Sequence, residues 1–375
     1  MGMTESALWQ RYAAQFPVRD RLIYLNTAAV SPLSKPAADA MKQLSDDALL
    51  HGSLHYDQWL AAYEGLRVAS ARLIHSDRSE IALVKNTSEG IATVAMGLDW
   101  KAGDRVVVFR EEFPANYYPW LRLQEKGVIL TQLSLSDSLD RIDEAAHGAR
   151  LLSISFVNFL SGYRAPIEAI GEICRRNHCI YFVDAIQGLG AFPLDVRASH
   201  IDALAADGHK WLTGPEGCGI LYISQTLQDQ VEPVEFGWTN VAGYADYASR
   251  DMTLRADAGR YECGTLNTIG CFGLRAAIEL LLEVGPGVIA PVVQNLGNRI
   301  ANGVLSKGYE LAADRTESHS AGIVSFRKSG VDPQPLVRRL RETGICVAPR
   351  AGWIRTSPHF YISPDDIDRM LAELP

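Results

Sequence analysis

A lysine and an aspartate interrupt two strongly apolar stretches of this 375-residue chain. Asp184 closes the run "IYFVDA" (180–185), and Lys210 follows 26 residues later, within "AADGHKWLTGPEGCGILY" (205–222). A lysine amine can form a Schiff base with an aldehyde, and a carboxylate at the end of an apolar strand is costly unless it meets a cation. The pair indicates covalent chemistry on a carbonyl compound, with the carboxylate keeping a heterocyclic nitrogen protonated. Gln187, three residues after Asp184, is placed to reach a ring oxygen.

Two other segments add a phosphate cradle and an aromatic side chain. Thr87 and Ser88, in "KNTSEGIATVAMGL", begin an apolar-periodic helix, where free backbone N–H groups and hydroxyls suit a phosphate. Phe113 follows the run "RVVVF" and is placed to stack on a flat ring. A plain helix cap and ordinary core packing are the alternatives for these residues. Together with the lysine and the carboxylate, they make up the four groups that pyridoxal phosphate requires.

Short apolar runs with helical segments between them must position these groups. The runs that we predict as strands buried on both faces are 105–109, 151–157, 180–185 and 217–223. A helix is predicted over "PIEAIGEICRRNH" (166–178), with Pro166 at its start, between the second and third runs. Strand, helix and strand in this order predict a mostly parallel sheet, whose ligands bind beyond the carboxyl ends of the strands.

The character of the sequence changes after about residue 235. The predicted elements there are helices over 268–284 and 288–307, strands over 321–327 and 345–349, and a helix with Ser363 as its N-cap and Pro364 at its first position. We therefore predict an α/β protein with a large domain (21–250), whose mostly parallel sheet is sandwiched by helices, and a smaller C-terminal α+β domain (251–375). Residues 1–20 are expected to pack on the small domain or on the substrate pocket.

Composition narrows the class of partner and the compartment. The chain has 47% hydrophobic residues and a formal net charge of −8, whereas nucleic acid and anionic membrane surfaces favour a basic patch, so neither partner is expected. Six cysteines without a CxxC pair indicate reduced thiols. No signal peptide is recognised, and no run approaches eighteen apolar residues. We expect a cytoplasmic protein.

The motifs "DGHKWLTGPEGCGILY" and "VDAIQGLG" resemble those of the class V aminotransferase superfamily. These are fold-type I pyridoxal-phosphate enzymes, and they include cysteine desulfurases, kynureninases and isopenicillin N epimerase-like proteins. The resemblance runs from "YLNTAAVSPL" near the N-terminus to "RTSPHFYISPDDIDRM" near the C-terminus, which is nearly the whole chain.

This resemblance implies a role for each of the residues above. Lys210 would form the Schiff base with the cofactor and move protons at the Cα atom of the substrate. Asp184 would pair with the pyridinium nitrogen, Gln187 with the phenolic oxygen, and Phe113 would stack on the ring. The residues that match phosphate or cofactor contacts are Thr87, Ser88 and His209.

The resemblance also implies a shared active site and an amino-acid substrate. Gly264 and Thr265, in "ECGTLNT", match a segment that in relatives reaches the phosphate bound to the neighbouring subunit, which implies a homodimer. Arg355 aligns with the arginine that grips the α-carboxylate of the substrate, a task suited to its planar fork. Asn26 and Ala28 lie in the stretch that lines the substrate pocket in relatives.

Two departures from the family pattern bear on the reaction. Cysteine desulfurases carry a mobile cysteine that accepts sulfur, in the loop before the carboxylate-binding arginine. The matching stretch here, "CVAPRAGWIR", is short, and Cys346 lies in its strand-like start, which favours a buried structural thiol. Asp207 stands where many relatives have Ser or Thr. A carboxylate would repel a phosphate, so Asp207 is expected to point away or to pair with a basic group.

We therefore predict a pyridoxal-phosphate enzyme that acts at Cα of an amino acid, either an aminotransferase or a C–S lyase without a persulfide cysteine. Epimerisation at Cα and kynureninase-like β-cleavage use the same residues and stay open. From other classes, a fold relative without catalysis is disfavoured because Lys210 and Asp184 are retained. A nucleotide-binding protein is disfavoured because the chain lacks both GxGxxG and GxxxxGK[ST].

The nine histidines suggest no metal site. His51 and His55 are one helical turn apart, but the sequence reveals no third ligand nearby. A solvated helix face is expected there, and no metal is predicted.

Overall fold

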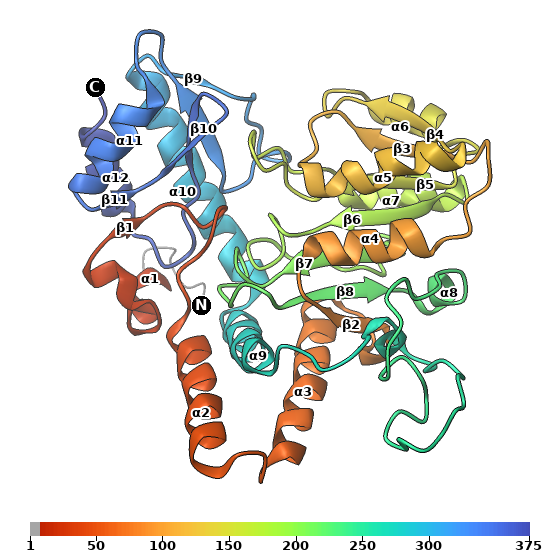
Figure 1. The fold of residues 1–375 in the computed structure, drawn as a ribbon. Helices are drawn as coiled ribbons and strands as arrows, with labels where there is room; N and C mark the ends of the chain where they lie inside the picture. Colours follow the sequence, from red (N-terminus) through yellow and green to blue (C-terminus); the bar gives the residue numbers. More distant parts are fainter. Residues whose placement is uncertain (1–7) are drawn as a thin grey trace.

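A seven-stranded sheet forms the centre of the computed structural model, which describes residues 8–375 (Figure 1). In order across the sheet, the strands are β2 (Ile81–Val84), β8 (Gly219–Ile223), β7 (Ala203–Asp207), β6 (Ile180–Asp184), β5 (Leu151–Ser155), β3 (Arg105–Phe109) and β4 (Ile129–Leu133). Neighbouring strands from β7 to β4 run parallel, and β8 is antiparallel to both of its neighbours. The prediction of a mostly parallel sheet is confirmed.

Alternation along the strands buries both faces of this sheet. Tyr181 and Val183 of β6 belong to one apolar cluster, whereas Phe182 between them belongs to the other. Among the helices that contribute to the first cluster are α3 (Tyr56–Ile74), α6 (Leu139–Ala146), α7 (Ile167–Arg176) and α9 (Thr268–Val284), and among those of the second are α4 (Thr87–Gly97) and α5 (Tyr118–Arg122). The predicted helix after Pro166 is α7, with Pro166 as its N-cap residue.

A second sheet lies in the C-terminal part of the chain. Its four antiparallel strands are β12 (Ala348–Arg350), β13 (Trp353–Thr356), β10 (Val324–Arg327) and β9 (Glu310–Leu311). The accompanying helices are α10 (Pro286–Ser306), α11 (Pro333–Glu342) and α12 (Pro364–Ala372). Helix α12 begins as predicted, because Ser363 caps it and forms a capping box with Asp366.

The N-terminal segment joins this C-terminal part. It contains α1 (Leu8–Arg11) and β1 (Ile23–Tyr24), and β1 pairs in parallel with β11 (Ile345–Cys346). Phe16 stacks on Tyr361, with ring centroids 4.1 Å apart. This contact supports a proposal that the segment packs on the small domain. Residues 1–7 of the predicted 1–20 segment lie outside the described residues, and the boundaries at 20 and 250 stay predictions.

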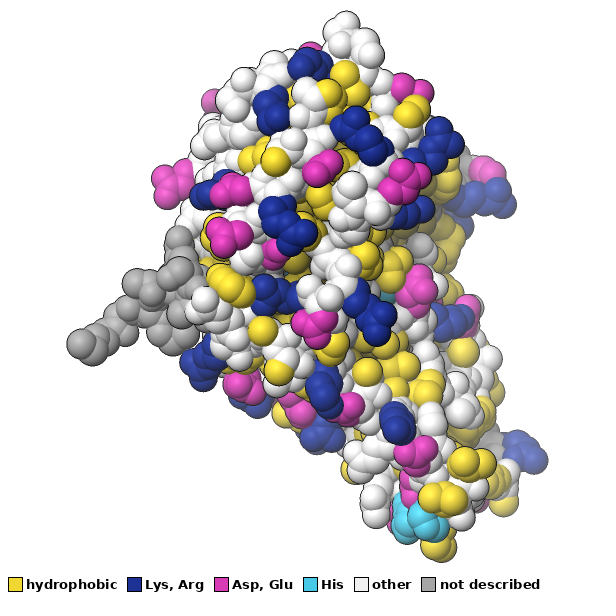
Figure 2. Space-filling model, turned by 90° about the vertical axis from the view of Figure 1, so that its left-hand side faces the viewer, with side chains coloured by type: hydrophobic (Ala, Val, Ile, Leu, Met, Phe, Trp, Pro, Cys, Tyr) yellow, Lys and Arg dark blue, Asp and Glu magenta, His cyan; other side chains and the backbone are white. Residues whose placement is uncertain are grey.

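Helices α2 (Lys35–His51) and α3 form a hairpin that projects from the body of the molecule, and α9 packs against both (Figure 1). Helix α8 (Gln225–Gln228) follows β8. Among residues 8–375, no single helix combines the length and apolar composition of a membrane span. Helices α9 and α10 meet that test when taken together, but they bend by 85° where they join. On the face drawn in Figure 2, basic and acidic side chains are interspersed.

Candidate active site

A cavity of about 370 Å³ opens at the carboxyl ends of β6 and β7, beside the first turn of α4. This is the edge of the sheet where the sequence placed the reactive groups. The predicted site residues that line it are Ala28, Thr87, Ser88, Phe113, Asp184, Gln187, His209, Lys210 and Arg355. The topology thus brings together residues from six segments of the chain.

Burial sets the protonation of the central pair. Lys210 lies in the turn after β7, and burial lowers the pKa of its amine to about 8, against the opposing effect of Asp184. Asp184 is 3% exposed, and burial raises the pKa of its carboxyl to about 6, although the Ile186 N–H donates to it at 3.1 Å and Lys210 acts in the same direction. The pKa values of both groups therefore lie close to neutral pH, which favours proton transfer to and from them.

The phosphate end of the cavity is the start of α4. Asn86 caps this helix by accepting from the Glu89 N–H at 2.9 Å, and the N–H groups of Thr87 and Ser88 fall in the first turn, which has no intrahelical acceptors. The Thr87 hydroxyl oxygen accepts from the Asp207 N–H at 3.0 Å, which ties α4 to the end of β7. A first turn that opens into a cavity suits an anion.

Asp207 has the basic partner that the sequence led us to expect. Its Oδ2 atom lies 3.1 Å from Nδ1 of His209, which is an ion-pair distance without the geometry of a hydrogen bond. Its Oδ1 atom is buried and has no hydrogen-bond partner in the part of the chain that the structure describes. Asp207 also lines the cavity.

Gln187 is held by two other segments. Its Nε2 donates to the carbonyl oxygen of Ala28 at 3.0 Å, and its Oε1 accepts from Nε1 of Trp211 at 2.9 Å. The amide keeps a second N–H for a ligand oxygen. This contact with Ala28 is also what brings the N-terminal segment to the wall of the cavity.

Phe113 covers the mouth of the cavity and is not a core residue. It is 44% exposed, and its ring centroid lies 5.8 Å from Nζ of Lys210. Phe159 meets it edge to face, with centroids 5.2 Å apart. A half-exposed ring beside the lysine is available to stack on a planar molecule, so the alternative of ordinary core packing is wrong for Phe113.

Arg355 approaches the cavity from β13. Its Nη1 donates to the carbonyl of Phe159 at 2.8 Å, whereas Nε and Nη2 are buried and have no hydrogen-bond partner within residues 8–375. Burial, with Arg350 nearby, lowers the pKa of Arg355 to about 10, so the side chain still carries its charge at neutral pH. Arg355 lines the cavity, and unpaired buried N–H groups of a guanidinium favour a carboxylate ligand.

Three predicted site residues lie away from this cavity. Asn26 forms a bridge with Ser357 and is not among the residues that line it. Gly264 and Thr265 line two other grooves, one shared with Lys85 and one with Trp238. Within one chain, they therefore do not meet Lys210.

The sequence reasoning missed several residues at or behind the cavity. Asn86, Phe159 and Arg350 line it. Glu112 lies behind it, where burial raises the pKa of its carboxyl to about 7 while the N–H and hydroxyl of Ser155 donate to it. Two of these residues could have been found in the sequence. Asn86 precedes Thr87 and is a typical helix N-cap residue, and Arg350 lies in the stretch "CVAPRAGWIR" before Arg355.

All six cysteines lie in the described residues, and none lines the cavity. Cys346 pairs with Tyr24 in the β1–β11 ribbon, where burial raises the pKa of its thiol. The stretch that leads to Arg355 is a tight hairpin between β12 and β13, with Ala351 and Gly352 at its tip. A short turn without a cysteine thus joins β12 to the strand that carries Arg355.

The cavity fits pyridoxal phosphate on its own features. One end offers the first turn of α4 for a phosphate, and the other offers the buried carboxylate of Asp184 for a protonated ring nitrogen. The amine of Lys210 and the exposed ring of Phe113 belong to the same cavity. The carboxyl of Asp184 is buried, and a pyridinium nitrogen would add a second cationic partner beside Lys210.

Comparisons with known proteins agree with this picture. Residues 23–362 match the family described as Aminotransferase class-V. The chain is 31% identical to a probable cysteine desulfurase of Methanothermobacter thermautotrophicus, across 94% of this chain and 93% of that protein. It is 26% identical to YcbU, an uncharacterized aminotransferase of Bacillus subtilis, across 97% of each. The apo structure of a cysteine desulfurase from Thermococcus onnurineus NA1 has a TM-score of 0.90 at 28% identity, covering 97% of this chain and 96% of that one.

Proposed function

Because this chain belongs to the class V aminotransferase family, whose cofactor is pyridoxal phosphate, we propose that it cleaves the C–S bond of cysteine or a related sulfur amino acid. Names given to its relatives include both cysteine desulfurase, at 31% identity, and aminotransferase, at 26% identity, and the higher identity to the desulfurase favours C–S cleavage. Arg355, whose buried Nε and Nη2 atoms have no hydrogen-bond partner within residues 8–375, supports an amino-acid substrate for either reaction.

The cofactor, when bound, supplies an electron sink for a carbanion at Cα of an amino acid. Asp184 would hold the ring nitrogen protonated, and Thr87, Ser88 and the first turn of α4 would bind the phosphate. Phe113 would stack on the ring and His209 would support that end of the site, with Gln187 donating to the phenolic oxygen. In this arrangement, Lys210 is the covalent anchor in the resting enzyme and the base that takes the Cα proton.

Arg355 orients the substrate. Its planar fork would bind the α-carboxylate through Nε and Nη2, which fixes Cα near the Lys210 amine. After the Cα proton moves to Lys210, the Cβ–S bond breaks and the sulfur leaves with the bonding electrons. For cysteine and one water molecule, the net products are hydrogen sulfide, pyruvate and ammonia. No oxidant or reductant is needed.

The position of the cysteines supports sulfur release without a persulfide on the enzyme. The β12–β13 hairpin contains no cysteine, and Cys346 lies outside the cavity with a raised pKa, which disfavours the reactive thiolate. An acceptor cysteine would have to come from elsewhere. Cys263, next to Gly264, is partly exposed, as Cys346 is, and it can be tested as such a residue from a second subunit.

We also propose a homodimer with shared active sites. Gly264 and Thr265 line a groove together with Trp238, Tyr56 and Leu60, which are 46%, 39% and 39% exposed. Exposed aromatic and aliphatic side chains around one groove favour a protein partner. A second copy on this surface would bring Thr265 to the neighbouring phosphate, as the sequence resemblance implies. Light scattering should give twice the 41.2 kDa chain mass, and Trp238→Asp should shift the protein toward the monomer.

The free thiols support a cytoplasmic enzyme, because none of the six cysteines is in a disulfide. The partners proposed are the amino-acid substrate and the second copy of the chain. We propose neither a nucleic acid nor a membrane as partner.

Product analysis tests the proposed reaction. The untagged holoenzyme should convert L-cysteine or L-cystine to pyruvate, with sulfur released in the first case as sulfide. Cys346→Ser and Cys263→Ser should keep this activity. Alanine as the product, together with loss of turnover in either cysteine variant, would instead identify a desulfurase with an enzyme persulfide.

An aminotransferase is the second candidate, favoured by the same Arg355 and Lys210 geometry. It would require a 2-oxo acid as amino acceptor and would release no sulfide. Amino transfer from an amino acid to pyruvate or 2-oxoglutarate, without sulfide, would decide for it. No turnover with any amino acid and no cofactor uptake would leave a binding protein.

A further inference from the structure

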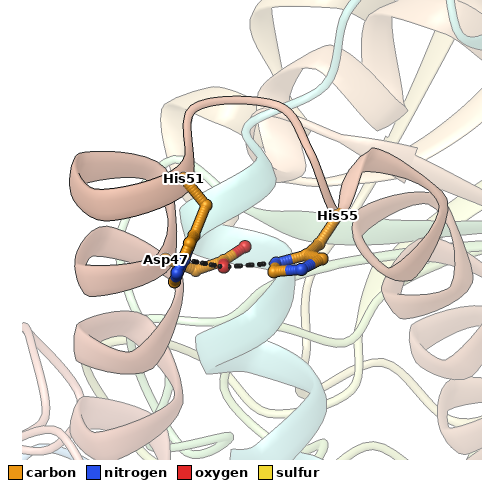
Figure 3. A group of neighbouring side chains, drawn as sticks. All are labelled: Asp47, His51 and His55. Carbon is orange, nitrogen blue, oxygen red and sulfur yellow. Dashed lines mark hydrogen bonds and ion pairs between the residues drawn. The ribbon is translucent and has the colours of Figure 1, made fainter.

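A cluster of one aspartate and two histidines lies at the end of the α2–α3 hairpin, outside the Lys210 cavity. Asp47 and His51 are one turn apart in the last turns of α2, and His55 is the residue before α3 begins. Figure 3 shows both imidazole rings directed at the carboxylate of Asp47, which lies between them. Asp47 lies four residues before His51 in the sequence, and the turn after α2 brings His55 to the same carboxylate, so Asp47 is the third ligand that the sequence analysis did not recognise.

The potential ligand atoms converge on one point. Oδ1 of Asp47 lies 3.0 Å from Nδ1 of His51 and 2.7 Å from Nδ1 of His55. The ligand atoms of all three residues lie within 4.8 Å of one another. Ligands at about 2.0–2.1 Å in a tetrahedral zinc site are about 3.3 Å apart, so small side-chain movements would admit the ion.

The backbone of the turn fixes this approach. Gly52 ends α2 with φ +61°, and its N–H donates to Ala48 at 3.1 Å. The Leu54 N–H then donates to the carbonyl of His51 at 3.2 Å, and the Tyr56 N–H to that of Ser53 at 3.1 Å. His55 is therefore held facing α2 by a hydrogen-bonded turn.

A second layer orients the carboxylate. Nε1 of Trp59, one turn into α3, donates to Oδ2 of Asp47 at 3.0 Å. This contact directs Oδ1 toward the two rings, as outer hydrogen bonds do for carboxylate ligands in metal sites. A carboxylate on an ordinary solvated helix face does not need a partly buried donor such as the Trp59 N–H.

The cluster is also accessible. The side chains of Asp47, His51 and His55 are 22%, 47% and 36% exposed, and they border a groove of about 610 Å³ together with Trp59. Histidine side chains, in cyan, gather at the lower tip of the molecule in Figure 2, where α2 and α3 meet. A fourth position is open to water, which is the usual arrangement for a zinc ion with three protein ligands.

We propose that Asp47, His51 and His55 bind one Zn²⁺ ion, which ties the end of α2 to the start of α3. Two neutral imidazoles and one carboxylate give the site a charge of −1 and the nitrogen–oxygen donor set that zinc accepts. The ion replaces the protons that the imidazole nitrogens now share with Oδ1. This inference is independent of the reaction at Lys210.

Calorimetric titration of the untagged holoenzyme with Zn²⁺, after treatment with a chelator, tests the site. One ion should bind per chain, and Co²⁺ should give visible d–d bands typical of low coordination. His51→Ala and His55→Ala should each weaken binding at least about tenfold, and Trp59→Phe by about tenfold through loss of the outer hydrogen bond. His147→Ala, an exposed histidine at the end of α6, is the matched control and should change nothing.

His51 is largely exposed, so its replacement should leave the fold intact, which circular dichroism can verify. The proposal is overturned if Zn²⁺ does not bind saturably to the parent enzyme. It is equally overturned if His51→Ala and His55→Ala bind Zn²⁺ as tightly as the parent.

Discussion

The Lys210 cavity and the Asp47 cluster both place basic nitrogen atoms near a carboxylate, yet the pKa of the carboxyl is raised in the cavity and lowered in the cluster. Asp184 is 3% exposed, and burial raises the pKa of its carboxyl to about 6. Asp47 has a side chain 22% exposed, and the hydrogen bond from His55, followed by that from Trp59, lowers the pKa of its carboxyl. Both carboxyl groups have donors that lower their pKa. Burial outweighs those donors at Asp184, whereas the hydrogen bonds outweigh burial at Asp47.

This difference explains what each site can do. In the cavity, desolvation brings an amine and a carboxyl close to neutral pH, which suits proton transfer. At the tip of the hairpin, the carboxylate of Asp47 stays ionised, and the side chains of His51 and His55 are partly exposed to solvent, which suits the binding of a cation. The first site thus pairs a carboxylate with an amine suited to covalent chemistry, and the second pairs a carboxylate with two imidazoles suited to coordination.

Removal of the buried amine should have the largest effect. Lys210→Ala should lower turnover by about 10³-fold or more, because both the covalent anchor and the base are lost. The near-visible absorption band of the holoenzyme should disappear or stop responding to amino acids. Lys126→Ala, an exposed lysine, is the control and should keep the band and the rate. Equal turnover in both variants would contradict the assignment of Lys210.

Removal of the buried charge should have the next largest effect. Asp184→Asn should lower turnover by about 10²- to 10³-fold, because the ring nitrogen loses its ionic partner. The pKa of Lys210 should fall further, since Asp184 raises it. A pH titration of cofactor absorbance together with steady-state rates measures both effects. A variant with parental rates would show that Asp184 does not meet the ring.

Truncation of the carboxylate-binding arginine should act on the substrate. Arg355→Ala should raise KM for cysteine by about 10- to 100-fold, as expected for lost hydrogen bonds to a charged group. Cofactor affinity should change little, which fluorescence titration can check. Arg327→Ala, an exposed arginine on the neighbouring strand β10, is the control. An unchanged KM would place the substrate carboxylate elsewhere.

The lowered pKa of Lys210 predicts how cofactor uptake depends on pH. The neutral amine is the nucleophile, and its fraction rises about tenfold per pH unit below the pKa. Uptake of pyridoxal phosphate by the apoenzyme should therefore rise with pH up to about 8 and level off above it. Stopped-flow absorbance measures this rate. A rate that continues to rise to pH 10 would show that the amine has the pKa of an exposed lysine.

The smallest effect is expected at the exposed carboxylate. Asp47→Asn should leave Tm almost unchanged in chelator, because surface ion pairs contribute little. With Zn²⁺ present, the parent enzyme should gain thermal stability and the variant should gain much less. Differential scanning calorimetry with and without Zn²⁺ makes the comparison. An equal gain in both proteins would contradict the proposed coordination by Asp47.

Much of the cavity was predictable from local sequence. Asp184 and Lys210 interrupt apolar runs, and Thr87 and Ser88 begin a helix, so their positions at element ends follow from short stretches of sequence. Parallel strands then place those ends at one edge of the sheet. Residues at strand ends and helix starts are thus brought together by rules that need no long-range detail.

The remaining features depend on tertiary contacts. Ala28 reaches the cavity because Gln187 binds its carbonyl, and Arg355 because β13 pairs with β10 and β12. Asp47 becomes a candidate ligand because the turn after Gly52 returns His55 to α2.

The sequence by itself determined the family, the sheet type and the chemical nature of the reactive groups, because these are written in local patterns of residue type. The tertiary structure decided which of the groups lose their water, and hence the direction in which each pKa moves. It also decided that Gly264 and Thr265 face away from the cavity of their own chain. Burial and proximity depend on segments far apart in the chain, so no short stretch of sequence contains them.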